Sequence, residues 1–317
     1  MNLKTAGDVT ITGRFAPSPT GVLHSGSLVT AVGSWLMARS CNGKWLLRID
    51  DLDAPRQMQG MADDIMHTLE DFGLFWDGEP SWQSRGYEAY EQAFQQLQQQ
   101  GLLYPCGCSR KEVAQAASAP HSEDDCPPYA GTCRSGMREN GVIRSWRVRV
   151  TEESICFDDV RRGSVCQNLY HHCGDFAVRR GDGGFAYQLA VVVDDHLSGV
   201  NQVVRGDDLL CSTPRQIYLQ KLLGLPQPAY CHLPLVTGPS GSKLSKRDNL
   251  VSHNLGNWRN RENDLLLAVL RFLGQRPPQE LTGASCREIL DWAVGSFDIK
   301  SLPDAGGQLQ IASYLKT

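Results

Sequence analysis

Residues 13–27 read GRFAPSPTGVLHSGS, and the fold of the chain can be worked out from this stretch. A β-branched run, VTIT at residues 9–12, comes before it, and residues 28–38 repeat apolar side chains at helical spacing. Two prolines and a Thr-Gly pair predict a fixed turn between a strand and a helix. We interpret the stretch as the first strand-to-helix crossing of an α/β sheet, the position at which such sheets bind ligands.

His24 and Gly26 fall where the predicted helix begins. Backbone N–H groups and the positive end of the helix meet there, so the position favours a phosphate. A simpler alternative is a Pro/Gly loop that carries a surface histidine. The next segment, KWLLRID at residues 44–50, predicts a second strand, and the two strands with their helix form a right-handed βαβ unit. This unit is half of a nucleotide-binding fold.

A second candidate site lies far along the chain, at residues 238–247, which read GPSGSKLSKR. This Gly/Ser loop ends in Lys243, Lys246 and Arg247, three cations that can converge on a polyphosphate. Basic loops of this kind are also common on solvated surfaces. The interpretation of the loop as a phosphate-binding site is favoured over a surface loop only when residues 13–27 are considered with it.

Together the two stretches resemble the signature motifs of the class I aminoacyl-tRNA synthetases, HSGS near the start and KLSKR after the sheet. Four segments are similar to the glutamyl-tRNA synthetase subgroup: RFAPSPTGVLHSGS, RIDDLD at residues 48–53, AYQLAVVVDD at 186–195 and VVRGDDL at 203–209. The resemblance implies an α/β fold with a Rossmann-type parallel sheet, a zinc-bearing insertion and a short helical C-terminal region. Ser27 stands where the family's first signature usually ends in histidine.

We expect the chain to divide into four segments. Residues 1–101 are the first half of the catalytic domain, 102–180 the insertion, 181–247 the second half with the KLSKR loop, and 248–317 a short helical region. The boundaries follow the loss of helical periodicity and the clustering of cysteines after residue 101.

Individual elements are predicted from periodicity and capping residues. Strands are expected at residues 186–193, 202–204 and 232–236, and helices near 61–72, 90–97 and 264–273. A further helix is bounded by Ser212 as N-cap, Pro214 in its first turn and Gly224 at its end. Ser285 and Glu288 have the spacing of a capping box.

Composition narrows the class of protein. The chain is 41% hydrophobic and carries a net charge of −4, so any nucleic-acid contact must come from local patches. We find neither a run of about eighteen apolar residues nor an export signal, and expect a cytoplasmic monomer without a membrane span. In such a chain the eleven cysteines are expected to be reduced thiols with a possible metal site rather than disulfides.

The resemblance implies amino-acid activation, in which a carboxylate attacks the α-phosphate of ATP and expels pyrophosphate. A carboxylate is already ionised at neutral pH, so catalysis rests on positioning and on groups that meet phosphate charge. The expected catalytic residues are His24, Lys243 and Lys246, and the expected ATP contacts are His24, Gly26 and Lys246. ATP is a substrate and is expected to bring Mg²⁺. The alternative for His24 is a packed histidine at a helix start.

A glutamate pocket requires cations for the carboxylate and an anion for the ammonium group. Arg14, Asp50 and Arg205 each end a predicted strand and project from the carboxyl edge of the sheet, although such residues also form plain salt bridges. The family usually has Glu at position 50, which leaves open whether the shorter Asp50 contacts the ammonium group. The glutamate-contacting positions that the resemblance implies are Arg14, Phe15, Ala16, Pro17, Ser18, Asp50, Tyr187 and Arg205.

Cysteines cluster in the insertion. Cys106 and Cys108 form a C-x-C pair, and Cys133 follows some 25 residues later, so three thiolates could hold part of a tetrahedral zinc site. The resemblance implies Cys106, Cys108, Tyr129 and Cys133 as the ligands of one Zn²⁺. Cys126 and His121 are the rival fourth ligands. Three adjacent side chains, His171, His172 and Cys173, cannot easily face one ion and are interpreted as structural.

The resemblance is greatest to short relatives of glutamyl-tRNA synthetase that activate L-glutamate and attach it to queuosine in the anticodon of tRNA(Asp). The first rival is a minimal glutamyl-tRNA synthetase that charges the 3′ end of tRNA(Glu). Only 70 residues follow Arg247, too few for the anticodon-binding domain of that enzyme. The second rival is a non-catalytic paralogue, against which the intact HSGS and KLSKR motifs argue.

Overall fold

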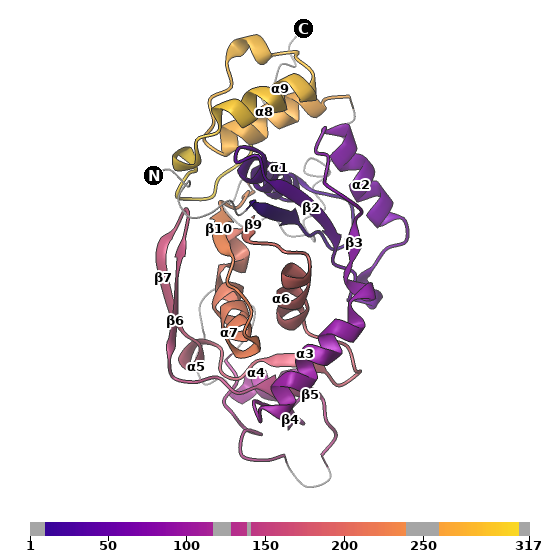
Figure 1. The fold of residues 1–317 in the computed structure, drawn as a ribbon, viewed down its shortest axis with the longest axis vertical. Helices are drawn as coiled ribbons and strands as arrows, with labels where there is room; N and C mark the ends of the chain where they lie inside the picture. The colour runs from indigo at the N-terminus through magenta and orange to yellow at the C-terminus, as the bar shows by residue number, and fades with distance from the viewer. Residues whose placement is uncertain (1–9, 117–127, 138–140, 239–259, 311–317) are drawn as a thin grey trace.

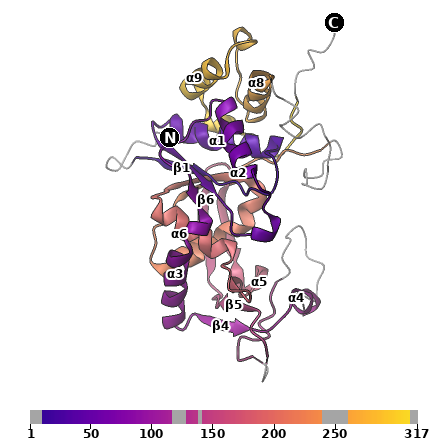
Figure 2. The ribbon, with the colours of Figure 1, turned by 90° about the vertical axis from the view of Figure 1, so that its right-hand side faces the viewer.

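The computed structural model describes residues 10–116, 128–137, 141–238 and 260–310, drawn in colour in Figure 1. Strands of a mainly parallel sheet run through the middle of the molecule. Helices α1 (Ser25–Arg39), α8 (Glu262–Phe272) and α9 (Cys286–Ser296) lie at one end, and a small antiparallel sheet lies at the other (Figures 1 and 2).

The first half of the main sheet is the predicted βαβ unit. β1 (Thr12–Phe15) pairs in parallel with β2 (Lys44–Ile49), and α1 connects them. β2 pairs in turn with the short β3 (Ser81–Trp82). β1 begins three residues later than the β-branched run suggested, because β2 begins at Lys44, which lies opposite Thr12.

The second half places two more strands beside this unit. β9 (Gln202–Gly206) and β10 (Ala229–Leu233) pair in parallel, and α7 (Thr213–Leu223) connects them. β10 thus begins three residues before the predicted strand. Ser212 and Gly224 lie at the two ends of α7 as predicted, although the Ser212 side chain makes no capping hydrogen bond. The Asn201 N–H donates to the Thr12 carbonyl at 3.1 Å, which sets β9 alongside β1. The carboxyl ends of β1, β2, β9 and β10 therefore share one edge.

The predicted strand at residues 186–193 is wrong: this segment is helix α6 (Tyr187–Leu197). Seven consecutive residues from 189 to 195 are buried, so the helix has no polar face and therefore no helical periodicity in its sequence. A run of three valines then looks like a buried parallel strand. The helix packs against both α3 (Tyr87–Gln99) and α7.

The insertion forms a three-stranded antiparallel sheet and a hairpin. β5 (Ser145–Val148) lies between β4 (Leu103–Cys106) and β8 (Ala177–Arg180). The hairpin consists of β6 (Ser154–Asp159) and β7 (Gly163–Asn168), and β6 also pairs with β10 at Asp159 opposite Tyr230. The insertion therefore extends the main sheet instead of standing apart from it.

A disulfide joins Cys156 to Cys166 across the hairpin, so the expectation of reduced thiols is wrong for this pair. The two residues are directly opposite in the β6–β7 register, with Cα atoms 4.1 Å apart, close enough for a disulfide. Composition and spacing carry no information on strand register, which is why the sequence did not reveal the pair. The other eight cysteines in the described part of the chain form no disulfide.

The C-terminal region is helical, as predicted. α8 and α9 pack on one another and on α1, and apolar side chains of all three belong to one core cluster. Ser285 and Glu288 form the expected capping box at the start of α9. No helix of the described residues is both long and apolar enough to span a membrane.

The remaining elements are short or cover the edges of the sheets. They are α2 (Met61–Asp71), α4 (Arg110–Ala116), α5 (Leu169–His172) and the 3₁₀ turns η1 (Ala54–Arg56), η2 (Gln83–Arg85), η3 (Asp207–Ser212), η6 (Gln279–Leu281) and η7 (Ile299–Ser301). Helix α3 includes the whole periodic segment that predicted it, and α2 includes all of its segment except Phe72, which is the C-cap.

Candidate active site and cysteine cluster

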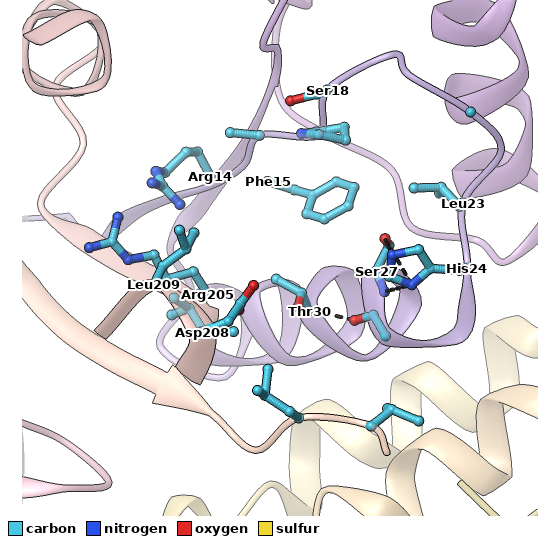
Figure 3. A pocket seen from close by; sticks show the side chains of 18 of the residues that line it. Arg14, Phe15, Ser18, Leu23, His24, Ser27, Thr30, Arg205, Asp208 and Leu209 are labelled. Atoms are coloured by element: carbon cyan, nitrogen blue, oxygen red, sulfur yellow. Dashed lines mark hydrogen bonds between the residues drawn. The ribbon is translucent and has the colours of Figure 1, made fainter. Parts of the chain in front are cut away.

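A cavity of about 690 Å³ opens at the carboxyl edge of β1 and β9. Figure 3 shows Arg14 and Arg205 on one side of it, His24 and Ser27 on the other, and Phe15 between them. The cavity thus has a cationic side and a side formed by the start of α1. Nine of the predicted site residues line it: Arg14, Phe15, Ala16, Pro17, Ser18, His24, Gly26, Tyr187 and Arg205. Lys243 and Lys246 lie outside the described residues.

His24 is the N-cap of α1. Its Nδ1 accepts a hydrogen bond from the backbone N–H of Ser27 at 3.1 Å, and the ring lies against Gly26. A Cβ atom on Gly26 would come within 3.2 Å of that ring, so glycine allows the imidazole to lie over the first turn. The histidine therefore has both a structural role and a position in the cavity. The helix start adds backbone N–H groups that suit an anion.

Arg205, in β9, is a buried cation without an anionic partner in the described structure. Its side chain donates from Nε to His232 at 3.2 Å and from Nη2 to Thr213 at 2.7 Å. Nη1 is buried and has no hydrogen-bond partner among the described residues. Burial lowers the pKa of Arg205, which is 3% exposed. A buried guanidinium with an unused donor at a cavity wall indicates a site for an anion.

Arg14, in contrast, is paired within the protein. Its Nε donates to Asp195 of α6 at 3.1 Å, and Arg48 of β2 donates to the same carboxylate. Burial opposes ionisation of Asp195, but the two arginines hold its pKa below the ordinary value. Arg48 also donates to Asp50 at 2.7 Å. The two arginines and two carboxylates form one buried network behind the cavity.

Asp50 belongs to this network and does not line the cavity. Burial raises its pKa to about 6, against the opposing effect of Arg48. Its backbone N–H donates to the carbonyl of Pro17 at 2.9 Å, which ties the end of β2 to the loop after β1. Asp50 therefore lies close to the cavity, but its carboxylate forms an ion pair with Arg48 instead of facing the cavity.

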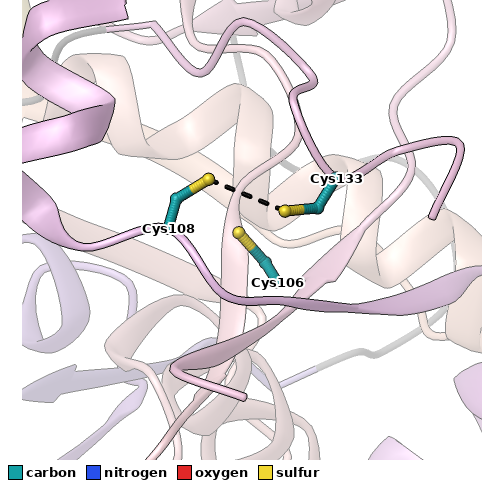
Figure 4. Close-up of side chains that lie close together, drawn as sticks. All are labelled: Cys106, Cys108 and Cys133. Carbon is teal, nitrogen blue, oxygen red and sulfur yellow. Dashed lines mark hydrogen bonds between the residues drawn. The ribbon is translucent and has the colours of Figure 1, made fainter. Parts of the chain in front are cut away.

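Cys106, Cys108 and Cys133 converge in the insertion, and their sulfur atoms lie within 4.8 Å of one another (Figure 4). The thiol of Cys106 donates to the hydroxyl oxygen of Tyr129 at 3.3 Å, and the sulfur of Cys108 lies 3.8 Å from the same oxygen. Three soft sulfur donors with a nearby phenolic oxygen fit a tetrahedral metal site. Cys126 and His121 lie outside the described residues.

Arg147, in β5, lies against this cluster. Its Nε donates to the sulfur of Cys106 at 3.3 Å, and its guanidinium lies 3.8 Å from the centre of the Tyr129 ring. Burial alone would raise the pKa of Cys106, but hydrogen bonding with Tyr129, with the Cys108 backbone and with Arg147 lowers it to about 7. The environment thus favours a thiolate, the form that binds metal.

The adjacent residues His172 and Cys173 form hydrogen bonds with nearby backbone carbonyls. Nδ1 of His172 lies 2.9 Å from the Asn168 carbonyl, and the thiol of Cys173 donates to the carbonyls of Leu169 and Gly174. Within the described ranges they do not gather into a cluster of three possible ligands.

Comparison with known proteins identifies the family. The family model of the class I tRNA synthetases (E and Q), catalytic domain, matches residues 10–291. A glutamyl-Q tRNA(Asp) synthetase from Geobacter sulfurreducens is 56% identical over 296 residues, which cover 93% of this chain and 94% of that protein. The chain belongs to this synthetase family.

Two further comparisons agree with the assignment of this chain to the class I synthetase family. A glutamyl-Q tRNA(Asp) synthetase from Dechloromonas aromatica is 49% identical and covers 92% of this chain and 95% of its own length. A crystal structure of a glutamate tRNA ligase from Elizabethkingia meningosepticum, in complex with its amino acid, superposes with a TM-score of 0.77 at 25% identity. That match covers 96% of this chain and 68% of the ligase. The Rossmann-type fold expected from the sequence is therefore confirmed.

Two residues that hold the arginines of the cavity, Asp195 and His232, were not expected from the sequence. Asp195 lies at the end of the segment AYQLAVVVDD, for which the sequence predicts a strand instead of helix α6. Its ion pair with Arg14 joins residues 181 positions apart, which local sequence patterns do not reveal. His232 was placed only as part of a strand, and its burial beside Arg205 follows from tertiary packing. A pair of acidic residues at the end of an apolar run was the one signal available for Asp195, because buried carboxylates generally have cationic partners.

The cap at His24 predicts a difference between two substitutions. His24→Ala removes the acceptor for the Ser27 N–H and should lower the free energy of unfolding by about 1 kcal/mol, whereas His24→Asn retains a good N-cap and should cost little. Chemical unfolding of both variants, followed by circular dichroism, measures the difference. Equal losses in the two variants would show that the cap does not stabilise α1.

Proposed function

We propose that this synthetase activates L-glutamate with ATP and transfers the glutamyl group to the queuosine base of tRNA(Asp). The observation that carries the amino-acid part is Arg205, a buried guanidinium with a free donor at the wall of the cavity. The acceptor rests on the family, because the related proteins are glutamyl-Q tRNA(Asp) synthetases.

Activation requires an oxygen of the glutamate α-carboxylate to attack the α-phosphate of ATP while pyrophosphate leaves. We assign the start of α1, with His24 and Gly26, to the phosphates, because its backbone N–H groups and the imidazole face the cavity together. Lys243 and Lys246 complete this assignment from the KLSKR loop, and Mg²⁺ accompanies the ATP. His24→Asn, which preserves the cap, should separate the role of the imidazole in activation from its role in stability.

Glutamate lies between the two arginines in this proposal. Arg205 receives the side-chain carboxylate through Nη1, Arg14 adds positive charge, and Tyr187 also lines the cavity. Phe15, at the end of β1, and the three residues that follow it, Ala16, Pro17 and Ser18, also line the cavity. We assign the carboxylate of Asp50 to its ion pair with Arg48 and to support of the loop after β1.

Glutamate should be activated in preference to glutamine, because an amide leaves the charge of Arg205 poorly paired. Losing a charged hydrogen bond costs roughly 1.5 to 3 kcal/mol, which is about a ten- to a hundredfold difference in rate. ATP–pyrophosphate exchange with each amino acid measures the preference, and Arg205→Ala should largely abolish it. Equal exchange rates with glutamate and glutamine would contradict the pocket.

The acceptor is predicted from the chemistry of queuosine. Its cyclopentene diol has neighbouring hydroxyls like those of a ribose, so it can attack glutamyl adenylate while unstacked loop bases are recognised. Labelled glutamate should be transferred to tRNA(Asp) that contains queuosine, and neither to the same tRNA with guanosine at that position nor to tRNA(Glu). Periodate oxidation of the 3′ end before the reaction would also destroy the queuosine diol, so the ester is located by nuclease mapping. Efficient charging of tRNA(Glu) would instead indicate a minimal glutamyl-tRNA synthetase.

We further propose that Cys106, Cys108, Tyr129 and Cys133 hold one structural Zn²⁺, which would cross-link two segments of the insertion. Metal analysis of the purified protein should find about one zinc per chain, lost in Cys106→Ala and in Cys133→Ala. Cys286→Ala, a free cysteine in α9, serves as the matched control and should retain it.

The same measurement identifies the fourth ligand. Loss of zinc in Tyr129→Phe supports the phenol, whereas loss in Cys126→Ala with retention in Tyr129→Phe assigns the position to Cys126. Full retention in both Cys106→Ala and Cys133→Ala would contradict the zinc site itself.

A further inference from the structure

Arg205 is held by a buried set of side chains to which the activation chemistry assigns no role. His232, in β10, is fully buried, and its Nε2 accepts from Arg205 Nε at 3.2 Å. Thr213, the first residue of α7, accepts from Arg205 Nη2 at 2.7 Å, and its hydroxyl lies 2.9 Å from the same Nε2 of His232. Two of the three guanidinium nitrogens are thus fixed, which leaves Nη1 for a ligand.

His232 can accept from Arg205 only if its proton lies on the other ring nitrogen. Asp159 determines this: its Oδ2 accepts from Nδ1 of His232 at 2.7 Å and from the backbone N–H of His232 at 3.0 Å. The other oxygen, Oδ1, accepts from the backbone N–H groups of Arg161 at 3.0 Å and Arg162 at 2.9 Å. All four neighbours are donors, so the site requires an ionised carboxylate with acceptors on both oxygens.

The ring is held neutral as well as oriented. Burial lowers the pKa of His232, and a protonated Nε2 would place a donor against the Nε–H of Arg205. Asp159 itself is supplied by β6, the strand through which the insertion joins β10. Asp159, a residue of the insertion, thereby helps to fix the side chain of Arg205 in the neighbouring part of the sheet.

We propose that Asp159 and His232 are positioning residues for recognition of the substrate carboxylate, which they achieve by fixing the guanidinium of Arg205. The proposal rests on the proposed function, since it concerns the same amino-acid site. Neither residue lines the cavity, and their effect passes through Arg205 and Thr213.

Asp159→Asn tests the proposal, because an amide cannot present acceptors on both sides. Either its NH₂ group faces the ring, which moves the proton of His232 to Nε2, or it faces the two backbone donors. Asp175→Asn is the matched control: Asp175 is another buried carboxylate of the insertion, 2% exposed like Asp159, and it accepts from Tyr104, Arg134 and the Val150 backbone.

Steady-state ATP–pyrophosphate exchange would be measured for the wild type and both variants, with glutamate and ATP varied separately. Asp159→Asn should raise the KM for glutamate about tenfold or more, with little change in the KM for ATP, and should reduce the preference for glutamate over glutamine. Asp175→Asn should leave both values near those of the wild type, even if it lowers the unfolding temperature.

If Asp159→Asn does not fold, a second pair of variants tests whether fixing Arg205 is required for glutamate recognition. Thr213→Val removes the hydroxyl that holds Arg205 at nearly constant volume, and Thr213→Ser retains it. A raised KM for glutamate in Thr213→Val with recovery in Thr213→Ser supports the proposal. Wild-type values in both Thr213 variants, or a KM in Asp159→Asn equal to that in Asp175→Asn, would overturn it.

Failure of the proposal is distinguishable from failure of the proposed function. If the wild type shows no glutamate-dependent exchange, the assigned amino acid is wrong. If the wild type exchanges and Arg205→Ala impairs it while Asp159→Asn does not, the amino-acid site stands and only the positioning role is lost.

Discussion

Positive charge that is buried at the edge of a parallel sheet is the constraint on which this structure depends. Arg14, Arg48 and Arg205 are each less than 5% exposed, and a guanidinium in such surroundings must find acceptors or an anion. Arg14 and Arg48 find them in carboxylates from α6 and from the end of β2. Arg205 has only neutral acceptors within the described structure, so its charge remains available for a ligand.

Most of the fold could be predicted because the motifs lie at sheet crossings, where chain geometry is local. The turn after β1, the helix that begins at His24 and the caps of α7 and α9 all depend on residues within a few positions of one another. The error at α6 has a different origin. A helix buried on every side has lost the polar stripe by which sequence periodicity distinguishes it from a strand.

The parts of the site that the sequence did not provide are those that depend on tertiary contacts. His232 contacts Arg205 because adjacent parallel strands place them side by side in the register of β9 and β10. Likewise Asp195 and the Cys156–Cys166 pair depend on which elements pack or pair, which one sequence does not record. The residue types indicated that Arg14 and Arg205 would bind carboxylates. Tertiary packing determines that Arg14 pairs with a carboxylate of the protein, whereas Arg205 does not.

The long sequence separation within the arginine network has a consequence for how the chain folds as it leaves the ribosome. Arg14 and Arg48 are synthesised early, yet their shared partner Asp195 lies 181 and 147 positions further on. Until α6 emerges, Arg48 has Asp50 as a local partner, but Arg14 lacks the carboxylate with which it is buried, so the first βαβ unit cannot complete its final packing without a cost. The buried pair of Arg14 and Asp195 therefore makes completion of the N-terminal half depend on a helix that is synthesised much later.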